Sequence, residues 1–462
     1  MAGIFVHQGG EVLVNAKARM RILLIVLGLT AVGVSAGVLG ETRGPIRILG
    51  NEDLTAENGV VSGKGTASNP YVIAGWEVET GPDDLYGVQI ENVTKPFVLR
   101  GLVVRYASDP LGAGIRIGFS EGGRIEGCTV ADSVNGVRII SSNDIEMYDC
   151  ILYTSGIGLR VLGEMPEEFR HEIDRSNLLN GKQILYFHGL DGETVEGHTT
   201  THLTIADSKN VTVVGNQVSD GDGILLAFVT DSTVQGNSAF RTKPVSTEHG
   251  IHLFESERNL VTSNTVRNNR LAGIQLSLSE ENELTGNQLL ANDTGIRLLA
   301  SDGNRVTENV VFANVAGIVL TGDAAGNEIV ENVVYHENTK QGIALESGSG
   351  NLVARNGLSD CEIGILLDAE AVENRIAANT IVSGAYGISL YGSTNEIAGN
   401  LLSQHSRGIL FPETFTKTTT RGNTLQGNVF ADNANHLYTN LDSTENTFFG
   451  NVFLGDGRSK VS

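Results

Sequence analysis

Cysteine, methionine and basic residues are all scarce in this 462-residue chain, and each scarcity excludes a class of protein. Three cysteines cannot build a disulfide scaffold, so stability must come from packing. Four methionines are too few for a methionine-rich carrier of soft metals. Lysine and arginine total 32 against 54 acidic residues, for a formal charge of -22. Because phosphate binding needs clustered cations, this balance disfavours a nucleic-acid partner.

Long apolar runs are missing after the first 40 residues. From Lys17 the sequence reads KARMRILLIVLGLTAVGVSAG, with a basic start, an apolar run from Ile22 and small residues at 34–36. This order is typical of a secretory signal, so we interpret residues 1–40 as a signal peptide or an N-terminal membrane anchor. Export to the periplasm, the cell surface or the medium is predicted. Membrane contact is expected only through a retained anchor.

Two common catalytic motifs are also absent. The chain contains no G-x-x-x-x-G-K-[ST] and no H-E-x-x-H. Nucleotide-binding and zincin chemistries therefore have no support in the sequence.

What the sequence does contain is a repeat. A glycine followed by isoleucine or valine recurs every 21 to 27 residues over most of the second half. Three earlier pairs, in the first half, have glycines at 114, 136 and 156. The glycines of the later pairs are Gly223, Gly250, Gly273, Gly295, Gly317, Gly342, Gly364, Gly387 and Gly408. An asparagine series keeps the same period, at Asn216, Asn237, Asn264, Asn287, Asn309, Asn332, Asn356, Asn379, Asn400, Asn428 and Asn451. Two residue types sharing one period indicate stacked structural units.

Each unit has strand and turn patterning. Apolar residues alternate over four or five positions, as in GIRLL at 295–299, and then stop at Gly, Asn, Asp or Ser. No helical stripe appears, and Ile and Val outnumber Leu at the repeated positions, which disfavours helical and leucine-rich solenoids. The predicted fold is all-β, a single parallel β-helix with coils of about 22 residues.

This fold assigns a role to each repeated residue. In coils stacked about 4.8 Å apart, the same position recurs above itself, so asparagine side chains can form a hydrogen-bonded ladder. Glycine fits a corner that needs positive φ or close backbone approach. Cys128 and Cys150 stand 22 residues apart at ladder positions, as stacked thiols or as a disulfide. We expect an N-terminal cap over 41–80, the β-helix over 81–440 and a C-terminal coil and tail over 441–462.

Two segments interrupt the repeat, and on repeat scaffolds function usually lies at interruptions. The first is an insertion at about 163–203, where no Gly-Ile pair is found. The second is FRTKPVSTEHGIHLF at 240–254, which lengthens one coil to 27 residues. The shared period places Asp222 beside His249, because each precedes a repeat glycine.

These segments predict a polar cleft. Candidate catalytic residues are Asp220, Asp222 and His249, as carboxylates for acid–base work and an imidazole for proton transfer. Candidate substrate-binding residues are Arg241, Lys243, Glu248 and His252, the two cations suiting a uronate charge. The alternative interpretation is that both aspartates are turn residues beside glycine and that His249 is a corner residue.

A metal site is the competing hypothesis. His188, His198 and His202 fall close together, and His198 and His202 could lie on one side of a Thr-rich strand. A divalent copper, zinc or calcium ion is the cofactor that such a site would hold. Exposed histidines without a ligand are the alternative.

Two longer stretches resemble a known family. GKGTASNPYVIAGWEV at 63–78 and IDRSNLLNGKQILYFHG at 173–189, together with the Gly-Ile and Asn coils, resemble the NosD-like group of exported right-handed β-helix proteins. Asn180-Gly181-Lys182 and Tyr186 are the most specific residues, and Gln183 stands where the family usually has proline. The resemblance implies a right-handed fold and a link to copper delivery for nitrous oxide reductase, with an ABC transporter as partner. It transfers no set of copper ligands.

Three functions follow as hypotheses. The first, which we favour, is a non-catalytic exported scaffold that binds a saccharide or a cell-envelope protein. The second is a polysaccharide lyase, hydrolase or epimerase using residues 220–252. Its resemblance to polygalacturonase-type β-helices is partial, because Arg241-Thr-Lys243 precedes the histidine and Glu248 replaces a glycine. The third is periplasmic metal handling by the three histidines of the first interruption.

Overall fold

A computed structural model describes residues 40–241, 249–335, 339–411, 420–438, 445–455 and 458–460. The chain divides into two compact units, Met1–Glu41 and Thr42–Ser462, and the second contains the fold described below. The expected signal or anchor segment lies outside the described residues, apart from its last one. Among the described residues, no helix has the length and apolar character needed to span a bilayer.

The coils of the second unit form two stacks, of which the first has three sheets. One sheet contains β2 (Ile46–Ile48), β6 (Tyr86–Glu91), β9 (Ala113–Gly118), β12 (Val137–Ile140) and β15 (Leu159–Leu162). Another contains β3 (Val60–Ser62), β4 (Tyr71–Ala74), β7 (Phe97–Arg100), β10 (Gly123–Glu126), β13 (Glu146–Tyr148) and β16 (Glu172–Ile173). The third contains β1 (Glu41–Arg43), β5 (Trp76–Glu79), β8 (Val103–Arg105), β11 (Thr129–Ser133), β14 (Ile151–Thr154) and β17 (Leu178–Leu179). Two short 3₁₀ helices, η1 (Asn51–Asp53) and η2 (Pro166–Phe169), complete the stack.

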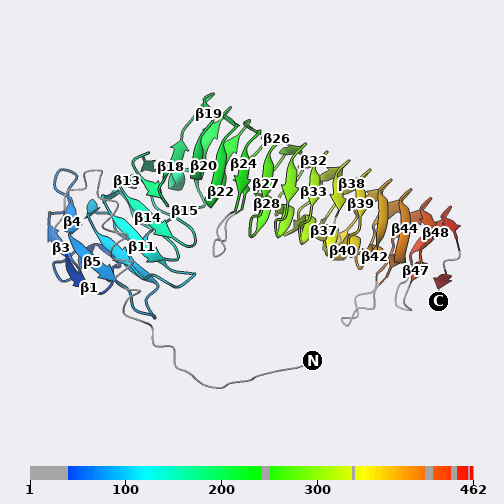
Figure 1. Cartoon of the computed structure of the whole chain (residues 1–462), viewed down its shortest axis with the longest axis horizontal. Helices are drawn as coiled ribbons and strands as arrows, with labels where there is room; N and C mark the ends of the chain where they lie inside the picture. Colours follow the sequence, from blue (N-terminus) through cyan, green and yellow to red (C-terminus); the bar gives the residue numbers. More distant parts are fainter. Residues whose placement is uncertain are drawn as a thin grey trace, which may run out of the picture. The chain divides into compact units, whose positions relative to one another are not determined.

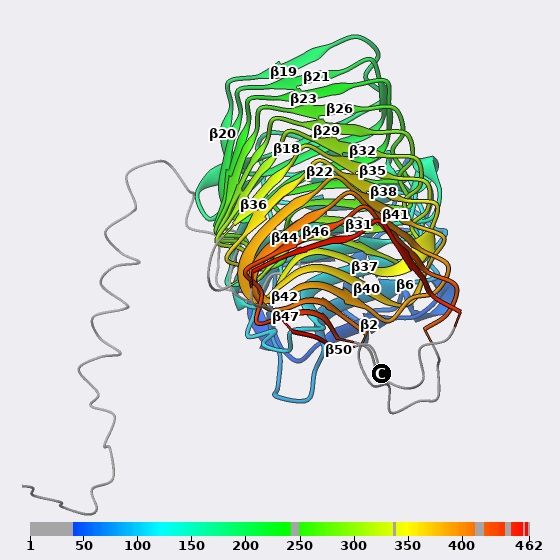
Figure 2. The same cartoon turned by 90° about the vertical axis from the view of Figure 1, so that its right-hand side faces the viewer.

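The second stack is longer. Its outer sheet contains β19 (Thr194–Glu196), β21 (Thr212–Val214), β23 (Thr233–Gln235), β26 (Leu260–Thr262), β29 (Glu283–Thr285), β32 (Arg305–Thr307), β35 (Glu328–Val330), β38 (Leu352–Ala354), β41 (Arg375–Ala377), β43 (Glu396–Ala398), β45 (Thr424–Gln426) and β48 (Thr447–Phe449). The remaining strands are β18 (Lys182–His188), β20 (Thr199–Lys209), β22 (Gln217–Thr230), β24 (Ser238–Phe240), β25 (Ile251–Phe254), β27 (Thr265–Arg267), β28 (Ala272–Ser277), β30 (Gln288–Leu290), β31 (Thr294–Leu299), β33 (Val310–Phe312), β34 (Ala316–Thr321), β36 (Val333–Tyr335), β37 (Gln341–Ser349), β39 (Gly357–Ser359), β40 (Ile363–Val372), β42 (Thr380–Leu390), β44 (Leu401–Leu410), β46 (Val429–Ala431), β47 (Asn435–Tyr438), β49 (Val452–Leu454) and β50 (Arg458–Lys460). Figure 1 shows these coils following one another in chain order, and Figure 2 shows them nested when viewed along the stack.

The Gly-Ile repeat sets the register, as predicted. Ile224 pairs with Ile251, Ile251 with Ile274, and Ile274 with Ile296, and the pairing continues to Ile409. These inward side chains are fully buried, which stabilises each coil by about 1.5–3 kcal/mol per side chain. The prediction of an all-β, right-handed parallel β-helix is confirmed.

The repeat glycines are needed for close backbone approach. A Cβ added to Gly295 would lie 2.6 Å from the carbonyl oxygen of Gly317 in the next coil and 2.5 Å from a Val311 methyl group. Positive φ, the other predicted reason, applies to Gly223, which has a φ of +85°. In the first stack the period shifts, because Val137 pairs with Leu159. The prediction that Gly156 continues the repeat was therefore wrong by two residues.

The asparagine ladder is confirmed in atomic detail. In a typical step, the side-chain amide of Asn287 donates to Asn309 Oδ1 at 2.9 Å and to the carbonyl of Val261 at 2.8 Å. The backbone N–H of Asn287 also donates to Asn309 Oδ1. Each asparagine thus satisfies turn groups of two neighbouring coils inside the protein. Cys150 occupies an asparagine position of the ladder, since its backbone N–H donates to Asn177 Oδ1. Cys128, Cys150 and Cys361 are buried and form no disulfide.

An antiparallel hairpin joins the two stacks. Leu178 pairs with Gln183 and Leu179 with Lys182, around a turn in which Asn180 and Gly181 have φ of +52° and +83°. All other pairings between the numbered strands are parallel except β3 with β4. The hairpin reverses the strand direction, so β18 begins a new parallel series with β20. Residues 163–203, where the repeat is interrupted, contain this reversal. One hydrophobic cluster lies within the second stack, and the other fills the first stack and extends past the reversal to Ile184, Ala206 and Ala227.

Candidate functional site

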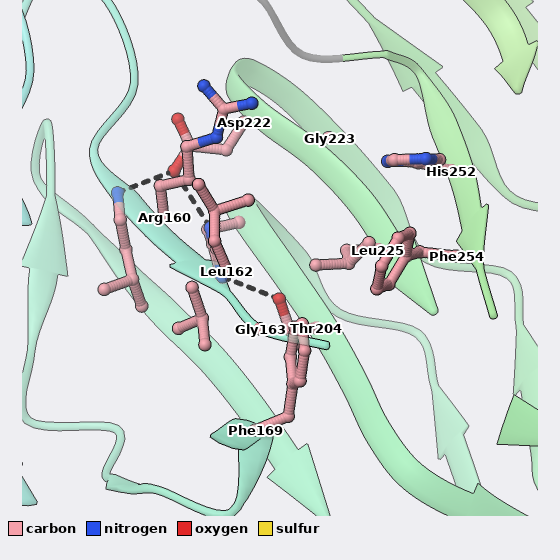
Figure 3. Close-up of a pocket in the computed structure, with 13 residues that line it drawn as sticks. Arg160, Leu162, Gly163, Phe169, Thr204, Asp222, Gly223, Leu225, His252 and Phe254 are labelled. Atoms are coloured by element: carbon pink, nitrogen blue, oxygen red, sulfur yellow. Dashed lines mark hydrogen bonds and ion pairs between the residues drawn. The ribbon is translucent and has the colours of Figure 1, made fainter. Parts of the chain in front are cut away.

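A cavity of about 120 Å³ lies at the seam between the two stacks. The first stack contributes β15 and η2, and the second contributes β20, β22 and β25. Its walls are mainly apolar, formed by Leu159, Val161, Leu162, Phe169, Leu225 and Phe254. Its polar side contains Arg160, His202, Thr204, Asp222 and His252 (Figure 3). An apolar cavity with a few convergent polar groups is the usual form of a small-molecule site.

Asp222 closes the seam from the second stack. Its Oδ1 accepts a hydrogen bond from the Gly158 N–H at 2.8 Å, and its Oδ2 accepts one from the Leu159 N–H at 3.0 Å. Figure 3 shows this carboxylate between the two stacks. The two backbone donors belong to a coil 64 and 63 residues earlier in the chain. Asp222 is therefore a bridge between stacks as well as a cavity residue.

His202 extends the Asp222 contact along the cavity wall. Its Nδ1 lies 2.9 Å from Asp222 Oδ2, and its Nε2 lies 2.9 Å from the Thr204 hydroxyl. All three side chains are at least nine-tenths buried. Because the aspartate accepts at Nδ1, the ring carries a proton on that nitrogen, and a neutral ring then accepts from Thr204. Both ring nitrogens of His202 are occupied by protein groups.

Aromatic rings form the opposite wall. Phe169 on η2 lies 5.4 Å from Phe228 and 6.1 Å from Phe254, measured between ring centroids. Phe228 and Phe254 are 5.7 Å apart and nearly perpendicular. These are favourable aromatic geometries, and they join the first stack to β22 and β25. This wall of the cavity is thus apolar.

Two histidines next to the cavity carry no charge at neutral pH. Burial lowers the pKa of His252 to about 4, and the positive charge of Arg160 contributes to the shift. Burial also lowers the pKa of His249 well below its usual value, and His252, Arg297 and Arg160 lower it further. The rings of His249 and His252 lie 5.0 Å apart. The positive charge of this cluster is therefore carried by the two arginines, one from each stack.

The predicted catalytic residues are only partly together. Asp222 and His249 each lie two residues before the paired Ile224 and Ile251, so their backbones are neighbours, as expected. Their side chains have different partners, since His249 Nδ1 accepts from the Ala272 N–H at 3.1 Å.

Asp220 lies apart from this group. Its backbone is left-handed, with a φ of +60°, and its carboxylate is exposed. It forms an ion pair of 3.3 Å with Arg241, one of the predicted substrate-binding residues. The grouping of Asp220 with Asp222 in one cleft was therefore wrong, because the positive φ turns the first carboxylate outward. Lys243 and Glu248 lie outside the described residues.

The three histidines proposed as metal ligands do not converge. His188 Nε2 lies 3.4 Å from Glu172, His198 is a half-buried turn residue, and His202 is bound to Asp222 and Thr204. The described residues contain no group of three or more His, Cys, Asp or Glu side chains placed to hold a metal ion. The expected His188–His198–His202 site is not formed, because His188 on β18 and His202 on β20 contact different neighbours and His198 lies outside both strands.

Sequence reasoning missed Arg160, which lines the cavity, and Arg297, which lies near His249 on β31. Arg297 follows the repeat pair Gly295-Ile296, so the repeat gave a signal for it. Arg160 follows Gly158-Leu159, two residues beyond the predicted pair at Gly156, so the repeat gave no signal for it. Their outward direction follows from strand alternation. Phe169 gave no signal, because its place at the seam depends on the hairpin.

The coils, the ladder and the seam cavity define the class: a right-handed parallel β-helix protein with a small cavity between two stacks. The chain belongs to the NosD family, described as periplasmic copper-binding protein, whose profile matches residues 170–339 and 334–460. The family is periplasmic, in agreement with the predicted export.

The chain is similar to several solved structures, at low sequence identity and low TM-score. The mannuronan C-5 epimerase AlgE4 A-module of Azotobacter vinelandii is 14% identical, with a TM-score of 0.39, covering 75% of this chain and 91% of its own. The periplasmic alginate epimerase AlgG is 14% identical, with a TM-score of 0.37 and coverages of 88% and 84%. PfbA, a surface adhesin of Streptococcus pneumoniae, is 11% identical, with a TM-score of 0.31 and coverages of 70% and 81%. No curated protein matches the chain.

Proposed function

We propose that this chain is an exported, non-catalytic binding scaffold and that the seam cavity binds part of a saccharide. The observation that carries the proposal is the division of the cavity into an apolar aromatic wall and a polar wall. A sugar ring has the same division, with C–H groups on its faces and hydroxyl groups at its rim. Phe254 and Leu225 would pack on a ring face, and His252 and Thr204 would bond hydroxyl groups.

An enzyme is less well supported by the arrangement of carboxylates. Two-carboxylate hydrolysis requires both groups to flank one glycosidic bond. Asp222 already accepts bonds from two backbone N–H groups and His202, whereas Asp220 is exposed and paired with Arg241. The two carboxylates therefore have separate structural roles, and we propose no catalytic step.

Copper is the ligand in the family description, but the described residues do not fit it. His202 uses both ring nitrogens for protein contacts. The other histidine pair, His249 and His252, lies beside Arg160 and Arg297, whose positive charge opposes a cation. Cys128 and Cys150 are buried in the core ladder, where their thiols contact backbone carbonyls. No function through copper is derived for this chain.

A glycan array followed by calorimetry tests the proposal. The secreted chain is screened first, and the best saccharide is titrated into wild type, Phe254→Ala and Phe312→Ala. Phe254 and Phe312 are both half-buried on outer faces, but only Phe254 lines the cavity. We expect Phe254→Ala to weaken binding about tenfold and Phe312→Ala to leave it unchanged. The absence of any saccharide binding, or equal effects of the two variants, contradicts the proposal.

A further inference from the structure

Arginines recur at one outward position of the first stack. Arg116 pairs in register with Arg138, and Arg138 with Arg160, on the successive strands β9, β12 and β15. The strand spacing places such neighbours about 4.8 Å apart. Like charges directly opposite each other destabilise a sheet, so a row of three arginines is an arrangement that the fold alone does not favour.

The protein partly compensates the row. Arg116 forms a 2.6 Å ion pair with Glu91 and lies 5.2 Å from the ring centroid of Tyr86. The guanidinium of Arg138 donates to the carbonyl of Leu111. These contacts fix the Arg116 and Arg138 side chains against the surface of the sheet.

The second stack continues the row with polar residues. His252 pairs in register with Gln275, and Gln275 with Arg297, on β25, β28 and β31. The seam joins the two rows, because Arg160 and His252 line the same cavity (Figure 3). Thr204 on β20 and Leu225 on β22 occupy the same register position as His252 and also line the cavity. The line therefore passes from Arg160 across the cavity to His252.

Among the second-stack residues of this line, Gln275 and Arg297 each have one buried polar atom without a hydrogen-bond partner in the described chain. Gln275 is only 5% exposed, and its Nε2 donates to the Ser277 hydroxyl at 2.8 Å, but its Oε1 accepts no hydrogen bond. The buried Nε of Arg297 has no acceptor. Buried groups of this kind are uncommon in native proteins and require an explanation, because each costs about 1–3 kcal/mol. A ligand that donates to Gln275 and accepts from Arg297 would satisfy both.

We propose that this line is the binding track for an acidic polysaccharide with a carboxylate on successive sugars. The track consists of Arg116, Arg138, Arg160, His252, Gln275 and Arg297. Carboxylates accept from the arginines, and sugar hydroxyls donate to Gln275 and bond the neutral His252 ring. The inference rests on the proposed function and specifies its substrate class.

Calorimetry with oligogalacturonates of one to six residues tests the inference. Fully methyl-esterified hexamers serve as the neutral comparison. We expect affinity to rise with length and to fall at least about tenfold on esterification, since charge-assisted hydrogen bonds are lost. Arg297→Gln is expected to weaken hexamer binding about tenfold, and Arg138→Gln to weaken the hexamer while leaving the monomer unaffected. Arg305→Gln, on the outer sheet and paired with Glu328, is the matched control.

The outcomes separate the two proposals. If no saccharide binds at all, both the proposed function and the track fail. If the neutral hexamer binds as tightly as the acid, or if Arg305→Gln weakens binding as much as Arg297→Gln, the track is wrong while saccharide binding stands. Equal binding of a hexameric oligodeoxythymidylate overturns the assignment to a polysaccharide. Gln275→Leu provides a second variant should Arg297→Gln not fold, and it is expected to weaken the hexamer without changing the preference for acid over ester.

Discussion

Asp222 and Leu159 are 63 residues apart in the sequence, yet a 3.0 Å hydrogen bond joins the Asp222 carboxylate to the Leu159 N–H. The same carboxylate accepts from Gly158, and these contacts connect the last coil of the first stack to β22 of the second. Most contacts in a β-helix are between neighbouring coils. This pair instead joins the two stacks, and it does so at the edge of the cavity.

Replacing Asp222 with alanine is expected to destabilise the protein strongly. The substitution leaves two buried backbone N–H groups and His202 without an acceptor, and we expect a loss of about 4 kcal/mol. Urea unfolding followed by circular dichroism measures it. Asp220→Ala is the control, because its exposed ion pair with Arg241 contributes about 1 kcal/mol or less. Equal losses of unfolding free energy for the two variants would show that the Asp222 contact does not contribute more than the surface ion pair.

Replacing Gly295 with alanine tests the close approach of coils. The added Cβ would lie 2.6 Å from the Gly317 carbonyl, so the coils must separate locally, at about 2 kcal/mol. Gly357→Ala is the matched control, since a Cβ there meets no atom within 4 Å and is expected to change stability by about 0.5 kcal/mol or less. Thermal unfolding measures the stability of both variants. A Gly295→Ala variant as stable as the wild type would refute the packing argument.

Stability is expected to fall in mild acid, partly through His171. This side chain is 1% exposed, and burial lowers its pKa from 6.5 to about 4. The unfolded chain therefore binds a proton at higher pH than the folded chain does. The resulting stability is complete above about pH 6.5 and is lost as the pH falls towards 4, by about 3 kcal/mol. We expect His171→Leu to flatten the dependence of the unfolding free energy on pH across this range. Parallel curves for the two proteins would contradict the assignment.

The periodic part of the fold was readable from the sequence because each coil repeats the same physical requirement. A residue such as Asn287 bonds its counterpart in the next coil, and Gly295 permits the approach that brings the two together. Such requirements recur at fixed intervals, so register and core follow from spacing alone. The position of Asp222 beside His249 followed from the same spacing.

The functional site was less predictable because it depends on one non-periodic event. Asn180-Gly181 is a strong hairpin signal, but nothing local to it shows that two stacks meet there or that Arg160 comes next to His252. Asp220 and Asp222 were grouped because both border the turn before Gly223. Asp220 has a positive φ and an exposed carboxylate paired with Arg241, whereas the Asp222 carboxylate is buried between the stacks.

The reversal at Asn180-Gly181 also separates the repeated coils, whose number can change in evolution, from the hairpin, whose geometry cannot. Coils far from it, such as that containing Gly317 and Ile318, contact only their two neighbours. Duplication of one such unit would lengthen the second stack without moving any group at the hairpin. The length of the protein can therefore vary among descendants by whole coils, while the geometry between the stacks is inherited unchanged.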